Sequence, residues 1–213
     1  MAETDLHWQW MVTITERLKR YFAKQRVYVA SDLLIYYEED NPRKSVAPDA
    51  FVVLDCKPGN RDIFQIWKER RTPNFTLETT SKTTRREDRI KKKEVYAQIG
   101  VAEYFLYDPR QEWLKPPLQG YRLAKGDYDL IPPDADAGIV SEQLGVRFVL
   151  ESGALAMFSS STGERLLSGT ELADELERRL HEATEARKSM EKELAQLRES
   201  GKKANGPKRK NAK

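Results

Sequence analysis

The sequence predicts an α/β domain with a mixed central sheet flanked by helices, followed by a separate helix and a basic tail. Short stretches rich in β-branched and aromatic residues alternate with segments of helical periodicity, and a heptad pattern follows them. The final segment, 201–213, holds six Lys or Arg and no acid. We therefore expect a domain over residues 1–170, a coiled-coil helix over 171–200 and a disordered tail over 201–213.

The N-terminal part predicts one helix and two strands. Apolar residues recur at helical spacing over residues 6–24. Residues 27–37 (VYVASDLLIYY) are rich in strand-forming side chains. Residues 45–56 (SVAPDAFVVLDC) predict a second strand, which is apolar on both faces beyond Asp49 and should be central in the sheet.

A third strand and a second helix follow. Residues 74–80 (NFTLETT) predict the strand. Thr84 and Glu87 match a capping box, in which each side chain satisfies a backbone N–H of the other. The helix should run over residues 84–98 and stop at Gly100, a residue suited to a helix C-terminus.

The rest of the domain predicts further strands. Residues 101–109 (VAEYFLYDP) predict a strand that is closed by a proline. Residues 120–131 (GYRLAKGDYDLI) alternate around a Gly-Asp turn and predict a hairpin. Residues 134–170 carry only short apolar pieces and a Ser/Gly-rich segment, so the prediction there is weak.

A heptad seam of about four repeats begins at residue 171. Its members are Ala173, Leu176, Leu180, Ala183, Arg187, Met190, Leu194 and Leu197. Arg187 is a charged defect in this seam. A helix packed against the domain is an alternative, but one seam on one chain has no other partner, so we expect a homodimer through residues 171–199.

Charge and cysteine content restrict the class of protein. The formal net charge of the 213 residues is +3, and without the six charges of the tail it becomes −3, so nucleic-acid binding must depend on local clusters. The single cysteine, Cys56, excludes an intramolecular disulfide and fits a reducing compartment. No signal-peptide pattern and no apolar run long enough for a bilayer occur, so we expect a cytoplasmic protein without a membrane partner.

Two carboxylates lie in or beside apolar strands, where a charge is costly unless it is paired or bound to a metal. Asp49 follows Pro48 at the entry of one strand. Glu78 shares one face of the next strand with Thr76 and Thr80. The alternatives are an aspartate in a turn and a glutamate on a solvated sheet face.

The helix after Glu78 brings in a lysine. On a helical wheel, Asp88, Val95 and Tyr96 all fall on the same side as Lys92, so Lys92 is centred on the face that docks on the sheet. Its neighbours in the chain lie to either side of this face and can reach solvent. A salt bridge from Lys92 to Asp88, one turn away, is an equally good explanation of that lysine.

Two acids and a lysine suit metal-assisted hydrolysis of phosphodiesters. Oxygen ligands favour Mg²⁺ or Mn²⁺, and the lysine would orient water or stabilise developing charge. The candidates for phosphate contact, for which plain solvation is the alternative, are Lys82, Arg85, Arg86 and Arg89. His7 and His181 lie far apart, one cysteine makes no usual zinc site, and no phosphate-loop or nucleophile-elbow motif occurs.

Several motifs with their spacings resemble the Uma-two family of the PD-(D/E)xK nuclease superfamily. They are Pro48-Asp49, Glu78 with Ser81, Asp88, Lys92, Tyr96, Gly100-Val101, Glu103-Tyr104 and Asp108-Pro109. The resemblance implies a restriction-endonuclease-like fold, DNA as substrate and a divalent metal at Asp49 and Glu78. We also expect Asp88, Thr80 and Tyr96 to support the site.

The resemblance departs from the wider superfamily at one position. The superfamily lysine lies two residues after the glutamate, where this sequence has Thr80. The family is thought to supply the lysine from the following helix, which here is Lys92. Two alternatives stay open: a catalytically inactive nucleic-acid-binding or scaffold module that is dimerised by the C-terminal helix, and a purely structural network of Asp49, Glu78, Asp88 and Lys92.

Overall fold

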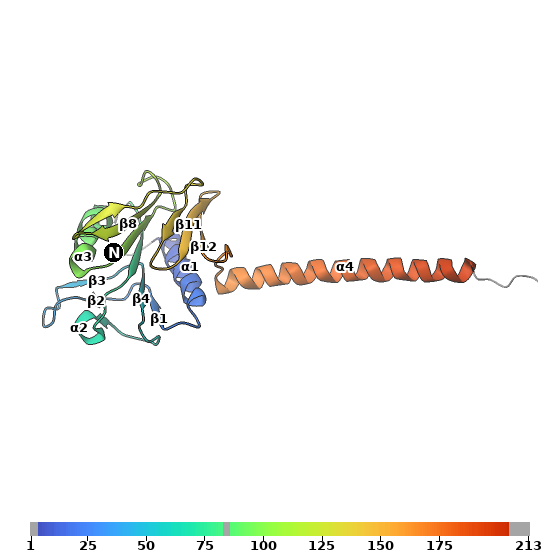
Figure 1. Cartoon of the computed structure of the whole chain (residues 1–213), viewed down its shortest axis with the longest axis horizontal. Coiled ribbons are helices and arrows are strands. Elements are labelled where there is room, and N and C mark those ends of the chain that lie inside the picture. The colour runs from blue at the N-terminus through green and yellow to red at the C-terminus, as the bar shows by residue number, and fades with distance from the viewer. Residues whose placement is uncertain (1–3, 83–85, 205–213) are drawn as a thin grey trace, which may run out of the picture. The chain divides into compact units, whose positions relative to one another are not determined.

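The computed structural model describes residues 4–82 and 86–204, except the side chains of residues 87, 89 and 199–204. The chain divides into two compact units, Met1–Ser168 and Gly169–Lys213 (Figure 1). The helices of the first unit are α1 (Asp5–Tyr21), α2 (Ile66–Glu69), the π-helical segment η1 (Glu87–Lys92) and α3 (Lys93–Ile99). Its strands are β1 (Val27–Ala30), β2 (Ile35–Tyr36), β3 (Ser45–Val46), β4 (Ala50–Leu54), β5 (Phe64–Gln65), β6 (Phe75–Thr79), β7 (Glu103–Tyr107), β8 (Leu118–Ala124), β9 (Asp127–Leu130), β10 (Ile139–Ser141), β11 (Val146–Glu151) and β12 (Ala154–Ser159).

The centre of the first unit is a six-stranded sheet in the order β1-β4-β6-β7-β8-β9. Neighbouring strands run antiparallel except β6 and β7, which are parallel. This confirms the predicted α/β fold with a mixed central sheet, and β4 lies between two neighbours as its two apolar faces require.

Different elements cover the two faces of the sheet (Figure 1). On one face, α1 and the three-stranded sheet β10-β11-β12 enclose a core in which Phe148 stacks on Phe75. On the other face, α3 and the small sheet β3-β2-β5 pack over a second core that contains Phe51, Phe64 and Tyr96. The helix carrying Lys92 therefore docks on the sheet, as the helical wheel predicted.

The two strands predicted over 27–37 and 45–56 are each interrupted, and this part of the prediction was wrong. Asp32 adopts a left-handed conformation with φ of 47°, which aspartate tolerates and a strand does not. Its N–H donates to the carbonyl of Pro48 at 2.9 Å. Pro48 has no N–H to give to a ladder, so the second strand also breaks there, and β2 and β3 pair with each other outside the main sheet.

The predicted helix over 84–98 differs in its first part. Residues Glu87–Lys92 form a π-helix, and only Lys93–Ile99 are α-helical. The Tyr104 hydroxyl donates a hydrogen bond to the main-chain oxygen of Asp88 at 2.7 Å. This bond competes with the helical hydrogen bonds of the segment that forms the wider π-helix. The helix ends at Gly100 with φ of 79°, as predicted, while the capping pair Thr84 and Glu87 lies outside the described side chains.

The weakly patterned residues 134–170 form a sheet that the sequence analysis missed. Leu155 and Met157 on β12 alternate inward, as do Val146 and Phe148 on β11. Ser152 and Gly153 between these strands have positive φ, the mark of a two-residue hairpin turn. In the predicted hairpin the turn is Lys125-Gly126 rather than Gly-Asp, because these two residues carry the positive φ values.

The second unit consists of α4 (Gly169–Ala204). The helix continues past the expected end at residue 200, because a glycine such as Gly201 weakens a helix by about 1 kcal/mol but need not end it. The rest of the predicted tail, residues 205–213, lies outside the described residues. No helix within residues 4–82 and 86–204 is long and apolar enough to span a membrane.

We predict that Gly120→Ala destabilises the first unit. A Cβ at this position would lie 2.8 Å from Ile139 Cγ2 and 2.9 Å from Phe105 Cζ, inside the core between the two sheets. Such overpacking costs about 1–3 kcal/mol, which urea unfolding would measure. Gly169→Ala meets no atom within 4 Å and is the control, and equal stability of both variants would contradict the packing.

Candidate active site

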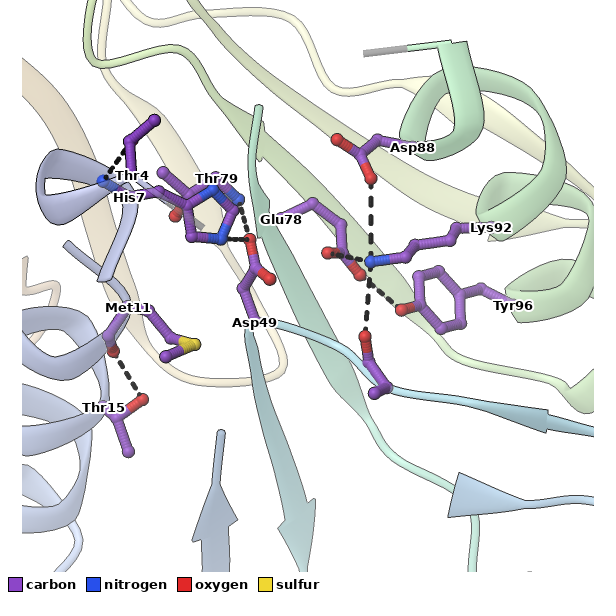
Figure 2. Close-up of polar contacts among 11 residues, drawn as sticks. Thr4, His7, Met11, Thr15, Asp49, Glu78, Thr79, Asp88, Lys92 and Tyr96 are labelled. Atoms are coloured by element: carbon purple, nitrogen blue, oxygen red, sulfur yellow. Dashed lines mark hydrogen bonds and ion pairs between the residues drawn. The ribbon is translucent and has the colours of Figure 1, made fainter. Parts of the chain in front are cut away.

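Asp49 and Glu78 come together because β4 and β6 are neighbours. Ala50 pairs with Leu77 in the antiparallel ladder, so the next step of the register sets Asp49 opposite Glu78 (Figure 2). Asp49 Oδ2 accepts the Thr79 N–H at 2.6 Å, which fixes one of its oxygens at the strand end. Glu78 is fully buried, so the solvated-face explanation does not hold.

Lys92 reaches Glu78 of this pair from the opposing helix. Its Nζ lies 2.6 Å from Glu78 Oε2, 3.6 Å from Asp88 Oδ1 and 3.2 Å from the Ala47 carbonyl (Figure 2). The two explanations of Lys92 therefore hold together: it pairs with Asp88 and also reaches Glu78. The other two lysines of its triplet point elsewhere, since Lys91 is exposed and Lys93 lies over the Tyr121 ring.

Tyr96 completes the surroundings of Glu78. It lies one turn beyond Lys92 on α3, is fully buried, and its hydroxyl donates a short hydrogen bond to Glu78 Oε1. Both oxygens of Glu78 are thus held by one helix, one by an ammonium and one by a phenol. Asp88 is also buried, and its main-chain oxygen is held by Tyr104.

The electrostatics of the cluster favour an added positive charge. Burial raises the pKa of Glu78 well above its usual value; Lys92 opposes this, and Asp49 and Asp88 add to it. Burial lowers the pKa of Lys92, but the three carboxylates outweigh burial and raise it, so the lysine stays charged. One ammonium faces three carboxylates, and a proton or a cation would relieve the excess negative charge.

The residues present fit a hard divalent cation. Asp49 Oδ1 has no hydrogen-bond partner among the described residues, and each Glu78 oxygen keeps a lone pair beyond its one bond. Mg²⁺ commonly uses one or two carboxylates and takes its remaining ligands from water and substrate phosphate. Within the described residues, no group of three or more His, Cys, Asp or Glu is placed to hold a metal.

His7 is a site residue that the sequence analysis missed. Its Nε2 lies 3.0 Å from Asp49 Oδ2, and the side chain is buried (Figure 2). Thr4 caps α1 and accepts the His7 N–H at 3.3 Å, so the first turn of the helix places the ring. No local signal links His7 to Asp49, because the two are far apart in the sequence and only the packing of α1 on the sheet joins them.

The other predicted residues are placed as follows. Thr80 is buried on the same face of the chain as Glu78, and its hydroxyl has no hydrogen-bond partner among the described residues. Lys82 and Arg86 are exposed, and both lie between Glu78 and Lys92 in the sequence. Arg85 and the side chain of Arg89 lie outside the described residues, so the structure does not place these two candidates.

A family model described as "Putative restriction endonuclease", named Uma2, matches residues 1–182. The chain belongs to the Uma2 family. The family indicates a nuclease of the restriction-endonuclease-like kind. A search of curated proteins finds no match.

A solved structure shows the same fold. It is the crystal structure of a "putative nuclease belonging to DUF820" from Anabaena variabilis ATCC 29413, with 14% identity and a TM-score of 0.51. The match covers 78% of this chain and 80% of that one. Together with the mixed sheet, this confirms the restriction-endonuclease-like fold that the motifs implied.

Two of the Uma2 motif residues have structural positions away from the cluster. Glu103 is buried and accepts hydrogen bonds from Ser141, from the N–H of Glu142 and from Arg122. It therefore ties β10 and the turn after it to the central sheet. Asp108 is also buried and organises the loop that follows β7.

We predict that, without metal, the Glu78→Gln variant becomes more stable relative to wild type as the pH rises. Because the pKa of Glu78 is raised in the folded state above its ordinary 4.5, the folded wild type binds more protons, so its stability falls as the pH rises above that value. The variant lacks this loss, which amounts to at most about 1.4 kcal/mol per pH unit. Urea unfolding in EDTA at pH 4 to 8 measures the difference.

Glu39→Gln, at an exposed acid outside the cluster, is the matched control. Parallel pH profiles for wild type and Glu78→Gln would show that Glu78 is not held as a costly buried charge.

Proposed function

We propose that this chain is a divalent-metal-dependent endonuclease that hydrolyses phosphodiester bonds of DNA. The supporting observation is the convergence of Lys92 on Glu78 at 2.6 Å, with Asp49 opposite Glu78 at the end of the adjacent strand. The Uma2 assignment supports the reaction class. A buried ammonium among carboxylates has little value for stability alone, because desolvation offsets most of the attraction.

The roles follow from the chemistry of each group. Asp49 and Glu78 would hold Mg²⁺ or Mn²⁺, which when bound activates water and neutralises charge on the scissile phosphate. Lys92 would position the attacking water or donate a hydrogen bond to the charge that develops on the phosphate. Tyr96 orients Glu78 through its Oε1, and His7 orients Asp49 through its Oδ2.

Lys82, Arg85, Arg86 and Arg89 would contact DNA phosphates near the helix start. Lys82 and Arg86 are exposed and so accessible to a strand. Such contacts supply affinity without sequence preference, so they do not set the recognition site.

We predict that wild type cleaves plasmid DNA with Mg²⁺ or Mn²⁺ and that Glu78→Ala, Asp49→Ala and Lys92→Met each lose at least about a hundredfold in rate. Glu94→Ala, an exposed acid on the same helix, should cleave like wild type. Calorimetric titration of Mn²⁺ should show binding to wild type and much weaker binding to Asp49→Ala. Equal cleavage or equal metal binding by wild type and Asp49→Ala would contradict the proposed metal site.

The competing function is a nucleic-acid-binding or scaffold module without catalysis, which Thr80 in the superfamily lysine position favours. Salt-sensitive DNA binding by wild type, together with no cleavage of any DNA form in either metal, would support this module. The position of Lys92 argues against it, because the amine reaches the glutamate from the helix.

We also propose that the protein forms a homodimer through residues 171–199. The large apolar side chains of the seam are exposed in the single chain, Leu180 by 69% and Met190 by 68%. Arg187, the charged defect, pairs with Glu191 on its own helix at 3.1 Å. An exposed stripe at heptad spacing is the pattern that pairs helices.

We predict that a chain shortened to end at Gly169 has the mass of a monomer by light scattering, while the full chain has twice its own monomer mass. In the full chain, Leu180→Glu with Leu194→Glu should also give a monomer, because charges in the seam oppose pairing. Lys192→Glu, on the outer face of the helix, is the control. A mass that is the same for all of these chains would exclude pairing through α4.

A further inference from the structure

A cavity of about 330 Å³ opens beside the candidate active site, on the side of α1. His7 lines this cavity and also contacts Asp49 Oδ2 at 3.0 Å. Thr80, two residues after Glu78, lines it as well. The cavity is thus separated from Asp49 by His7, and Thr80 lies two residues from Glu78 along the chain.

The lining combines apolar surface with positive charge. Leu6 and Trp113 contribute apolar and aromatic surface, and Lys82 and Arg110 contribute exposed cations. Glu112 also lines the cavity, so the cations exceed the acid by one. An aromatic ring next to cations matches the way proteins bind single-stranded nucleic acid, with bases stacked on rings and phosphates held by Lys or Arg.

One wall of the cavity is rigid without any ligand. The buried Asp108 accepts four backbone N–H groups: those of Arg110 and Gln111 through Oδ1 at 3.0 and 3.1 Å, and those of Trp113 and Leu114 through Oδ2 at 2.5 and 2.9 Å. This loop therefore holds Arg110 and Trp113 in place beforehand. Because this wall is ordered before binding, the protein loses less conformational entropy when a ligand binds.

One lining residue of the cavity, Thr80, carries a buried hydroxyl without a hydrogen-bond partner among the described residues. Thr80 is only 2% exposed, and its hydroxyl makes no hydrogen bond among the described residues, although its N–H donates to the Tyr107 carbonyl at 2.7 Å. A buried hydroxyl without a partner is costly. A bound group with a hydrogen-bonding edge, such as a nucleobase, would satisfy it.

We propose that this cavity holds one unpaired nucleotide of the DNA strand, next to the phosphodiester that is cut. The inference rests on the proposed nuclease function. The base would stack on Trp113 and meet the Thr80 hydroxyl, and its phosphate would face Lys82 and Arg110. A base inside a duplex is stacked on both sides, so only an unpaired or extruded base presents its face to a side chain.

The size of the cavity supports a single nucleotide. Its volume of about 330 Å³ is at the lower end of ligand pockets, which span about 300–1,000 Å³. The enzyme would therefore favour single-stranded, bulged or mismatched DNA over a perfect duplex.

The test measures binding in EDTA, so that no cleavage occurs, with two fluorescent oligonucleotides: a duplex with one unpaired thymidine and the matched duplex without it. Wild type should bind the first at least about fivefold more tightly, and Trp113→Ala should remove this preference, because base stacking on an aromatic ring corresponds to about a fivefold to hundredfold effect. Trp113→Phe, which keeps a ring, should restore most of it.

Trp67→Ala, a half-buried tryptophan on α2, is the matched control and should keep the preference. Should Trp113→Ala fail to fold, Arg110→Gln replaces it and should weaken binding of both oligonucleotides at least about threefold, with the exposed Arg43→Gln as its control. No preference in wild type, a preference kept by Trp113→Ala, or wild-type binding by Arg110→Gln would overturn the proposal.

The binding test is independent of catalysis. Wild type that prefers the unpaired thymidine but never cleaves would remove the nuclease mechanism and leave the nucleotide cavity. Wild type that cleaves with Mg²⁺ but binds both oligonucleotides equally would remove the cavity's role and leave the nuclease.

Discussion

The burial of Glu78 is the constraint on which the rest of the site depends. A carboxylate in the middle of a covered sheet must find partners, and the chain supplies both from one helix, Lys92 for one oxygen and Tyr96 for the other. These two contacts join η1 and α3 to the sheet. Because a buried ion pair adds little net stability, the arrangement supports our proposal that Glu78 and Lys92 serve catalysis.

The sequence predicted the part of the site that depends on short-range geometry. Glu78 lies on a strand and Lys92 on the helix that follows it, so side-chain alternation and a helical wheel predicted that Lys92 faces the sheet carrying Glu78, with a salt bridge to Asp88 as an equally good alternative. His7 and the cavity wall at Trp113 could not be predicted in this way. Their positions depend on how α1 and the loop after β7 meet the end of the sheet, which is a matter of tertiary packing.

The fold was predictable to the same extent and for the same reason. The central strands and the end of α3 followed from apolar runs and from Gly100. The interruptions at Asp32 and Pro48 follow from backbone conformation and a missing N–H, which act against the apolar pattern around them. The sheet β10-β11-β12 was missed because the prediction over residues 134–170 rested on apolar pieces interrupted by turns and a Ser/Gly-rich segment, and the packing on Phe75 and Phe105 could not be predicted from that pattern.

The position of the lysine shows that where its amine lies in space matters more than its sequence spacing from the glutamate. A lysine two residues after Glu78 and a lysine on the opposing helix can both bring an amine to the same carboxylate, and here Lys92 does so at 2.6 Å. The strand position is then available for another residue. Thr80 occupies it with a small side chain and lines the cavity beside His7. With the amine on the helix, there is room beside the two carboxylates that we propose as metal ligands, and this room is where we propose that the substrate nucleotide binds.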